Sequence, residues 1–333
     1  MNVTEIQQQL FQGIKRKLSS EEPVAEEVAR LLEISTDSAY RRMRGEKSIS
    51  FDELYKLATH YNISLDQLMG IQRDGFFFQG NILNPKTHRY DNYLTGMMHT
   101  MAYFNSFQKK EFYYLGKDLP VFHYFLFKDL AAFKYFFWMG TLMFFPEFKN
   151  KKINLDDFPD DLFELGKKNL EYYNQMDSYE IWNMESLNST LRQIEYYLDT
   201  DMFRSDEDAM RVYDAMEKIF DHLEEQAKLG HKFSFGDTAK TPLGKYNCYF
   251  NEIVLLDNSM MTVLDDYKMA MIPHTAINYM MTRDISFCDN LNNYIQNLIR
   301  RSTKISEVSE KERARFFRKI HDRIASRKKS LKV

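Results

Sequence analysis

A cluster of basic and small polar side chains at positions 36–47 has the chemistry needed to bind DNA. Arginine can donate a pair of hydrogen bonds to guanine in the major groove, and short polar side chains can also reach base edges. Arg44 and Lys47 are better placed for phosphates, which position a protein on DNA without reading its sequence. The residues expected to contact DNA are Thr36, Asp37, Ser38, Tyr40, Arg41, Arg42, Arg44 and Lys47.

These side chains need one exposed helix, and the surrounding residues predict it. Ser35 is a good N-cap because its hydroxyl can accept a hydrogen bond from an amide of the first turn. Ala39 and Met43, four apart, can face a core, and Gly45 ends the helix. The polar and basic residues are then mostly outward. Asp37 could accept from cytosine N4 or simply favour the positive end of the helix.

The flanking residues predict more helices. Val28, Leu31 and Leu32 lie at helical spacing and indicate a helix that meets the next one at a tight turn. Ser50 with Glu53 matches a capping box, and Ser64 with Gln67 repeats it before a short last helix.

The segment resembles the phage-repressor type (Cro/cI-like) of helix-turn-helix domain, a five-helix domain of bacterial transcription regulators. The resemblance covers about residues 6–70 and rests on EVARLLEIS, TDSAYRRMRG and SISFDELYKLATHYNISLDQLMG. It implies a dimeric reader of double-stranded DNA whose recognition helix, 35–44, enters the major groove. Two residues depart from the pattern. Glu33 stands where Gly or Asn is usual in the turn, which costs about 1 kcal/mol if its φ is positive. Arg42 stands where an apolar residue is common.

Charge and length indicate several parts. Residues 1–74 carry a net charge of −2, residues 75–299 carry −10 and residues 300–333 carry +9. A chain of 333 residues is long for one domain. We expect a DNA-binding domain at 1–70, a linker at 71–90, an α+β unit for dimerisation and effector sensing at 91–305, and a basic helix and tail at 306–333. The α+β unit could divide into two subdomains near 155–245.

The predicted fold class is mainly α with a smaller β component. Strands are expected at 76–80 and 111–116, a helix at 91–108, and antiparallel helix pairs over 160–230. A three-stranded meander is expected at 247–256, 259–264 and 267–272, followed by a helix on which Phe287, Leu291, Tyr294 and Leu298 share one face.

An aromatic-rich segment allows two interpretations. Positions 103–148 hold 18 Phe, Tyr or Trp in 46 residues. Such density favours a core or a dimer interface. The alternative is an apolar pocket for a small-molecule or peptide effector, with Asp118, His123 and Tyr124 as its polar groups. His123, inside PVFHYF, fits a buried core residue better than a ligand contact.

The basic C-terminal helix has three interpretations. Ser309 with Glu312 predicts its cap, and Phe317, Ile320 and Ile324 form its apolar stripe. Its basic residues could contact phosphates, dock on the acidic middle of the same or a partner chain, or be solvated.

The sequence contains no motif that would indicate an enzyme. It has no phosphate-binding glycine loop, no H-E-x-x-H and no G-x-S-x-G, and Cys248 and Cys288 show no metal or redox spacing. We therefore expect no enzymatic activity, no cofactor and no metal. The apolar run at 135–145 is too short to span a bilayer, and no secretory signal is present, so no membrane partner and a cytoplasmic location are expected. The rival interpretation is an interaction or scaffold protein whose helical module binds protein. A third is a small-molecule-binding enzyme in an unfamiliar fold.

Overall fold

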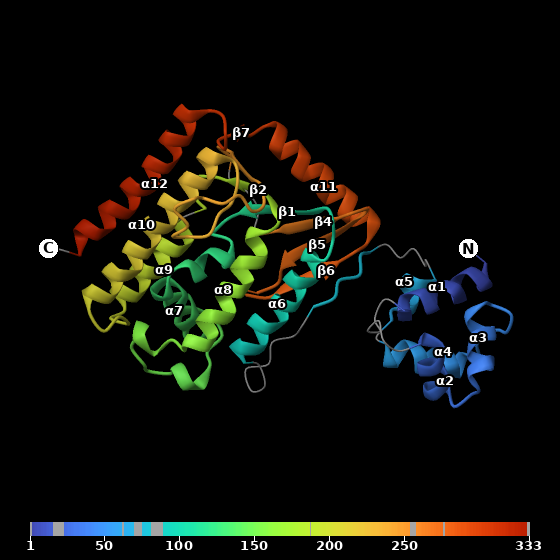
Figure 1. The fold of residues 1–333 in the computed structure, drawn as a ribbon. Coiled ribbons are helices and arrows are strands. Elements are labelled where there is room, and N and C mark those ends of the chain that lie inside the picture. The colour runs from blue at the N-terminus through green and yellow to red at the C-terminus, as the bar shows by residue number, and fades with distance from the viewer. Residues whose placement is uncertain are drawn as a thin grey trace. The chain divides into compact units, whose positions relative to one another are not determined.

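The chain divides into two compact units, Met1–Phe77 and Phe78–Val333 (Figure 1). The computed structural model describes residues 2–15, 23–61, 63–69, 75–80, 89–186, 188–253, 258–275 and 277–331, without the side chains of residues 66 and 67. Most of the predicted linker, 71–90, therefore lies outside the described residues. The fold class is confirmed, because helices dominate and one seven-stranded sheet supplies the β part.

Unit 1 is a small helical domain. Its described helices are α1 (Val3–Lys15), α2 (Val24–Leu32), α3 (Thr36–Met43), α4 (Phe51–His60) and α5 (Leu65–Leu68). All five bury apolar residues in one core, with Leu10, Ile14, Val28, Ala39 and Leu57 fully buried. Both hydrogen bonds of the capping box formed by Ser50 and Glu53 are present, as predicted. The second predicted box involves Gln67, whose side chain is outside the described residues.

Unit 2 is built on a mixed sheet in the order β6-β5-β4-β1-β2-β3-β7. Its strands are β1 (Lys110–Gly116), β2 (Asp177–Trp182), β3 (Tyr246–Phe250), β4 (Met260–Leu264), β5 (Tyr267–Pro273), β6 (Tyr279–Thr282) and β7 (Thr303–Lys304). The β1, β2 and β3 strands run parallel to one another, and the other pairs are antiparallel. Parallel neighbours need long crossover connections, which the helices between them provide.

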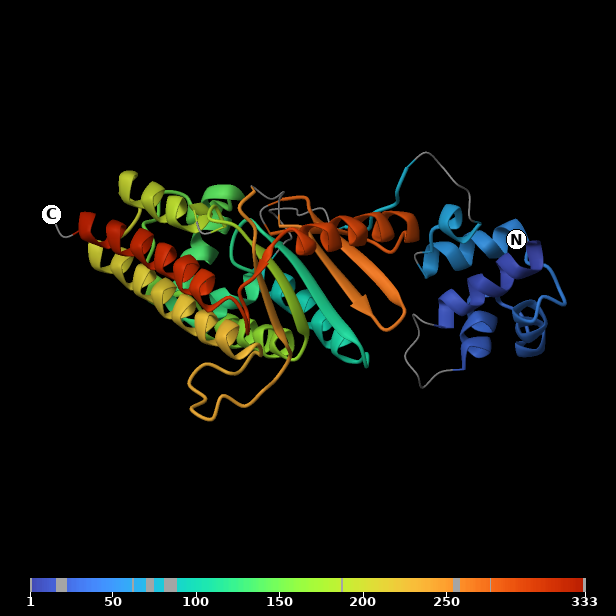
Figure 2. The ribbon, with the colours of Figure 1, turned by 90° about the horizontal axis from the view of Figure 1, so that it is seen from above.

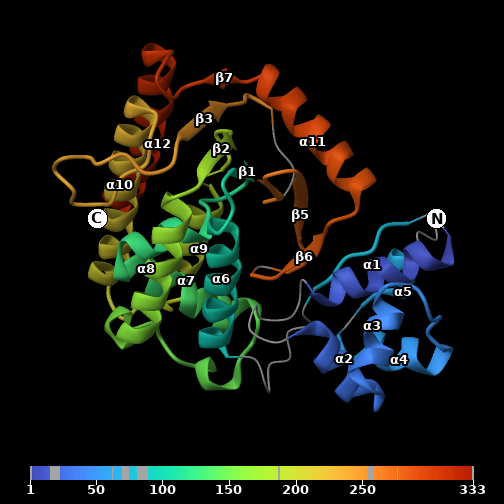
Figure 3. The ribbon, with the colours of Figure 1, turned by 45° about the vertical axis from the view of Figure 1, so that its right-hand side comes forward.

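Strand β1 separates the two faces of this sheet. Its side chains alternate, as the period of a strand requires. Phe112 and Tyr114 pack with α6 (Tyr90–Asn105) and α8 (Asp160–Asn174), whereas Tyr113 and Leu115 pack with α11 (Ile285–Arg300). Figures 1 and 3 show α6 and α8 on one side of the sheet and α11 on the other.

Beyond this sheet lies a helical layer that contains the largest core. Its elements are η1 (Val121–Leu126), α7 (Lys128–Phe136), the π-helix η2 (Phe137–Leu142), η3 (Pro146–Phe148), η4 (Leu155–Asp157), α9 (Asn188–Asp199), α10 (Asp206–Leu229) and α12 (Glu310–Ser330). The prediction that the aromatic segment is mainly core is confirmed, because Phe104, Phe112, Tyr114, Phe122, Phe125, Phe133 and Trp138 are buried.

Helix α12 docks on the acidic middle of its own chain. It lies alongside α10 (Figure 2), and its predicted apolar stripe of Phe317, Ile320 and Ile324 is buried. Lys328 Nζ is 2.5 Å from Asp214 Oδ1 and 2.6 Å from Glu217 Oε2. The docking interpretation of the basic helix is thus confirmed for these charges. The predicted cap is wrong, since Ser309 has a φ of 58° and its side chain makes no capping hydrogen bond.

Three predictions about the strands of unit 2 are wrong. The meander does not form, because β3 pairs with β2 and β7 while β4 pairs with β1 and β5. Residues 160–230 are not entirely helical, since DSYEIW forms β2 at the centre of the sheet. In 76–80, Gln79 makes an isolated bridge to Met281 and the segment forms no full strand. In all three cases the strand assignment depends on pairing with distant segments, which the local periodicity of the sequence does not reveal.

Candidate nucleic-acid interface

Helix α3 begins and ends where its sequence predicts. The Ser35 hydroxyl accepts a hydrogen bond from the Ser38 amide at 3.2 Å. Gly45 has a φ of 79°, and a Cβ there would lie 2.5 Å from the Thr4 side chain. These two residues fix the length of the helix that carries the predicted DNA contacts.

The turn between α2 and α3 places Glu33 in the left-handed region, with φ 57° and ψ 43°. Its backbone therefore adopts the geometry that Gly or Asn would adopt at less cost. The Ile34 amide donates to the Ala29 carbonyl at 3.0 Å, which closes the end of α2. The unusual residue is accommodated with strain, and the turn keeps its shape.

The prediction that Arg42 faces outward is wrong. Arg42 is 5% exposed, and its guanidinium donates to both carboxylate oxygens of Glu53 on α4, at 3.0 and 2.7 Å. A third hydrogen bond joins its Nη1 to the Ser38 carbonyl at 3.1 Å. The side chain lies at the core-facing position where an apolar residue is common, and a charge there needs this partner.

Gln7 is a positioning residue that the sequence reasoning missed. Its Nε2 donates to the carbonyls of Arg42 and Lys47 at 2.7 and 2.8 Å, and its Oε1 accepts from the Ile49 amide at 3.1 Å. The Gln7 side chain is 5% exposed. It thereby attaches α1 to the segment that follows α3. A glutamine at a helix position that faces the core is the one local signal of such a role.

The remaining predicted residues lie at the surface of unit 1. Thr36, Asp37, Tyr40, Arg41, Arg44 and Lys47 are exposed, and Ser38 is half-buried. Arg42 and Ala39 occupy the opposite, buried face of α3. The helix therefore presents a polar and basic face that is held in place from behind by the contacts of Arg42 and Gln7.

Glu46 pairs with both exposed arginines. Arg44 Nε is 2.8 Å from Glu46 Oε1, and Arg41 Nε is 3.9 Å from Glu46 Oε2. All three side chains are about half exposed, so water screens these pairs and they are weak. A phosphate or a guanine could replace Glu46 at little cost.

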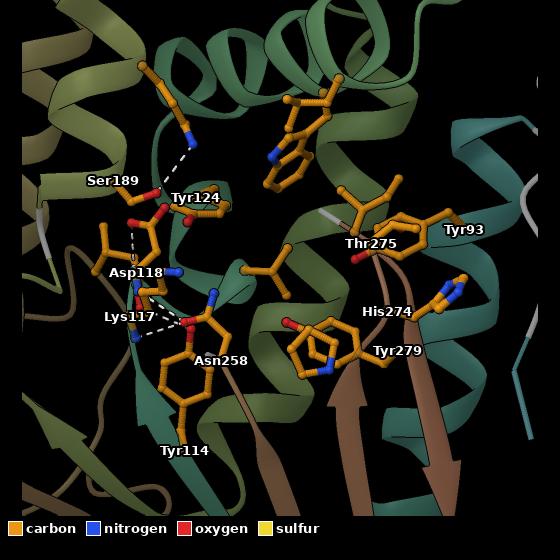
Figure 4. A pocket seen from close by; sticks show the side chains of 17 residues that line it. Tyr93, Tyr114, Lys117, Asp118, Tyr124, Ser189, Asn258, His274, Thr275 and Tyr279 are labelled. Atoms are coloured by element: carbon orange, nitrogen blue, oxygen red, sulfur yellow. Dashed lines mark hydrogen bonds between the residues drawn. The ribbon is translucent and has the colours of Figure 1, made fainter. Parts of the chain in front are cut away.

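The effector residues predicted in unit 2 are only partly brought together. Asp118 and Tyr124 line a cavity of about 360 Å³, and His123 does not. Figure 4 shows Asp118, Lys117, Asn258 and Ser189 on one side of this cavity, with Tyr93, Thr275, His274 and Tyr279 opposite them. Of these residues, the sequence reasoning had named Asp118 alone. The others come from α6, α9, the β5–β6 hairpin and the loops after β1 and before β4, which no local pattern connects.

The Asp118 carboxylate, which lines the cavity, already has two side-chain partners. Its Oδ2 accepts from Lys134 Nζ at 2.9 Å, and its Oδ1 accepts from the Thr190 hydroxyl at 2.7 Å. Lys134 is 1% exposed and its Nζ lies 4.5 Å from the centre of the Tyr124 ring. Burial lowers the pKa of Lys134, while Asp118 opposes that change. Lys134 and Asp118 thus form a buried ion pair inside the unit.

The expectation that His123 belongs to an effector pocket is wrong for the observed cavity. His123 is 1% exposed and its ring packs edge-on against Tyr173. Its Nε2 lies 3.9 Å from Glu180 Oε1, a carboxylate that also accepts from Trp182 Nε1 at 3.0 Å. His123 is thus a buried core residue, as the sequence PVFHYF predicted.

Metal sites and membrane-spanning helices also bear on function. Within the described ranges, no three His, Cys, Asp or Glu side chains are grouped as metal ligands would be. Among the described helices, none combines the length and the apolar character that crossing a membrane requires.

Comparison with known families supports the assignment of unit 1. Residues 4–92 match the family model of the BetR domain, a helix-turn-helix type of DNA-binding domain in transcription regulators. No curated protein and no solved structure matches the chain. The match includes α1 to α5 and therefore the whole face described above. The chain carries a DNA-binding domain of the kind found in regulators.

Proposed function

We propose that this chain is a sequence-specific transcription regulator that binds DNA as a homodimer, with α3 in the major groove. The observation that carries the proposal is the division of α3 into two faces. Arg42, Gln7 and Glu53 hold its inner face, and the outer face exposes Thr36, Tyr40, Arg41 and Arg44, among others. A rigidly held helix with an exposed polar face is what reading base edges requires.

The dimer follows from the geometry of such readers. One helix contacts few base pairs, so these proteins usually pair two recognition helices about 34 Å apart on successive grooves. In this proposal unit 2 dimerises and senses an effector, the domain is of the phage-repressor kind, and the protein acts in the cytoplasm, where the DNA lies. It has no catalytic role.

The rival function is binding of a protein through unit 1. Phe51 is 77% exposed and Tyr55 is 65% exposed, and they lie four residues apart on α4. Exposed aromatic pairs of this kind often belong to protein interfaces. This observation keeps an interaction or scaffold role as the second candidate.

Salt dependence separates the two functions. DNA binding releases counterions from phosphates, so the affinity for a mixed genomic duplex should fall steeply as salt rises. Replacing Arg44 with alanine should reduce the log–log slope by about one, because one phosphate contact is lost. Lys15→Ala, an exposed lysine at the far end of α1, is the matched control. Binding that is absent or insensitive to salt would favour the protein-binding role.

A further inference from the structure

The cavity of unit 2 has a size that suits a small molecule, and one of its walls also contacts the start of unit 2. It lies outside residues 4–92, and one of its walls is the hairpin that also holds the entry of the chain into unit 2. At about 360 Å³ it falls within the size range of small-molecule sites.

The lining is rich in neutral hydrogen-bonding groups. Hydroxyls come from Tyr93, Tyr279, Ser189 and Thr275. Burial raises the pKa of both tyrosines, so their phenols stay protonated and can donate as well as accept. Such groups match a ligand that itself carries several hydroxyls.

Side-chain amides add to this wall on the opposite side. Asn258 Oδ1 accepts from the amides of Lys117 and Asp118 at 2.8 and 3.0 Å, which fixes the orientation of the Asn258 carboxamide. Gln193 Oε1 accepts from Lys134 Nζ at 2.8 Å, which fixes that of Gln193 in the same way. In both amides the oxygen is engaged. The Gln193 NH₂ group also donates to the Ser189 hydroxyl at 3.4 Å, so its second proton and the NH₂ group of Asn258 are the donors left for a ligand.

The charges around the cavity disfavour a charged ligand. Among the described lining residues, Asp118 and Lys117 carry charge at neutral pH. Asp118 is balanced by Lys134, and Lys117 is exposed at the rim. Away from Lys117 at the rim, an ionised ligand would lose its hydration and meet only the charge of Asp118, which Lys134 already balances. Aromatic rings of Tyr93, Tyr279 and Trp138 instead offer apolar surface to the carbon skeleton of a neutral one.

The hairpin of β5 and β6 connects this cavity to the linker. His274, Thr275 and Tyr279 line the cavity, and two residues beyond Tyr279 the amide and carbonyl of Met281 pair with Gln79. Both hydrogen bonds of this bridge are 2.7 Å long, and the segment that carries Gln79 runs beside β6 (Figure 1). Gln79 lies two residues after Phe77, where unit 1 ends.

We propose that the cavity binds a small, uncharged, polyhydroxylated molecule of the monosaccharide or cyclitol class, and that β6 transmits its occupancy to the linker at Gln79. A ligand that contacts Tyr279 shifts or stiffens β6, and the paired segment follows because the bridge joins the two backbones. This inference rests on the proposed function, since it supplies the signal that a regulator of this kind would read.

The ligand class is tested by calorimetry on the full chain without DNA. The probes are glucose, galactose and myo-inositol, each compared with a charged analogue, namely gluconate, galacturonate and inositol hexakisphosphate. At least one neutral probe should bind at concentrations up to about 10 mM, and its analogue should bind at least tenfold more weakly.

Tyr279→Phe, which removes one hydroxyl and keeps the ring, should weaken binding about tenfold or more. Tyr196→Phe, an exposed tyrosine outside the cavity, is the matched control. Binding of the charged analogues alone, or of no neutral probe, overturns the ligand class.

The coupling is tested by hydrogen exchange at residues 75–80 with and without the bound probe. The bound probe should change the exchange rate of the backbone amide of residue 79 in the wild type. It should do so equally in Gln79→Ala, which keeps the backbone hydrogen bonds to Met281. In Gln79→Pro, which lacks the amide proton, the rest of the segment should no longer respond while the probe still binds. Equal responses in the alanine and proline variants overturn the coupling. Neither experiment uses DNA, so failure of the wild type to bind DNA would count against the proposed function alone.

Discussion

The guanidinium of Arg42 and the carboxylate of Glu53 join α3 to α4 by two hydrogen bonds of 3.0 and 2.7 Å. The pair is largely shielded from water, with side-chain exposures of 6% for Arg42 and 18% for Glu53. Glu53 also accepts from the Ser50 amide at 2.9 Å, so one carboxylate caps α4 and anchors α3. The orientation of the exposed face of α3, which we propose reads DNA, therefore depends on a pair of charges that lies on the opposite, buried side of the helix.

Replacing Arg42 with alanine should destabilise unit 1 by about 2–3 kcal/mol, because Glu53 would keep a shielded charge without its partner. Urea unfolding of the full chain, monitored by a probe in unit 1, measures this change. Arg41→Ala is the matched control and should change stability by no more than about 0.5 kcal/mol, since Arg41 is exposed. Equal stability of the two variants would contradict the structural role of Arg42.

The same pair predicts a dependence of stability on pH. The hydrogen bond from Arg42 is the main cause that holds the pKa of Glu53 below its ordinary value of 4.5. A depressed pKa stabilises the folded state above that ordinary value, and the stabilisation is lost as pH falls through the folded pKa. Unit 1 of the wild type should therefore lose stability below pH 4.5 more steeply than the Glu53→Gln variant. Parallel stability curves for the two proteins would argue against the assignment.

Glu33 should be replaceable with a gain in stability. Asparagine tolerates the left-handed region better than glutamate, so Glu33→Asn should stabilise unit 1 by up to about 1 kcal/mol. Thermal unfolding measures the gain. Glu33→Ala removes the same charge but lacks the short polar side chain that lets asparagine tolerate the left-handed region, so it should give little or no gain in stability. If alanine stabilises as much as asparagine, the charge of Glu33 and not its backbone is the cause.

The contact of Glu46 with Arg41 and Arg44 should compete with DNA. Removing its charge in Glu46→Gln frees both arginines and removes repulsion between Glu46 and phosphates, so affinity should rise several-fold. The gain should shrink at high salt, because these charges are exposed and screened. Fluorescence anisotropy at two salt concentrations measures both effects. Asp52→Asn, an exposed acid on α4, is the control for the general loss of a negative charge.

The basic residues of α12 that pair with acidic helices should contribute to stability and not to DNA binding. Lys328→Ala should lower the stability of unit 2 by about 1 kcal/mol, since Asp214 and Glu217 would lose their shared cation. The salt slope of DNA binding should stay the same. A slope reduced by about one would instead place Lys328 on a phosphate.

Local patterns predicted the helix ends of unit 1 well because the groups that cap a helix lie close in sequence. Ser35, Ser50 with Glu53, and Gly45 each act within one turn of a helix, so their types reveal the helix ends. The role of Arg42 was missed because its partner lies 11 residues away and on another helix. The sequence did show a charged residue at a position that is usually apolar, but it did not show that its partner is Glu53.

Unit 2 was predicted less well because its sheet joins strands that are far apart in the chain. Strand β1 pairs with β2 and β4, which follow it by more than 60 and more than 140 residues. The cavity was missed for the same reason, since its lining residues, such as Asp118 and Tyr279, are far apart in the chain and come together only in the folded unit. Aromatic density located the core but could not show where the packing leaves a space.

The most direct test of DNA reading by α3 is selection of bound sequences from a random duplex library. The wild type is compared with Arg41→Ala/Arg44→Ala, which removes two exposed bases from the outer face, and with Lys15→Ala as a control. We expect the wild type and the control to enrich the same two-fold-symmetric site, and the double variant to enrich no site or a degenerate one. Enrichment of the same site by all three proteins would contradict the claim that the exposed face of α3 reads DNA.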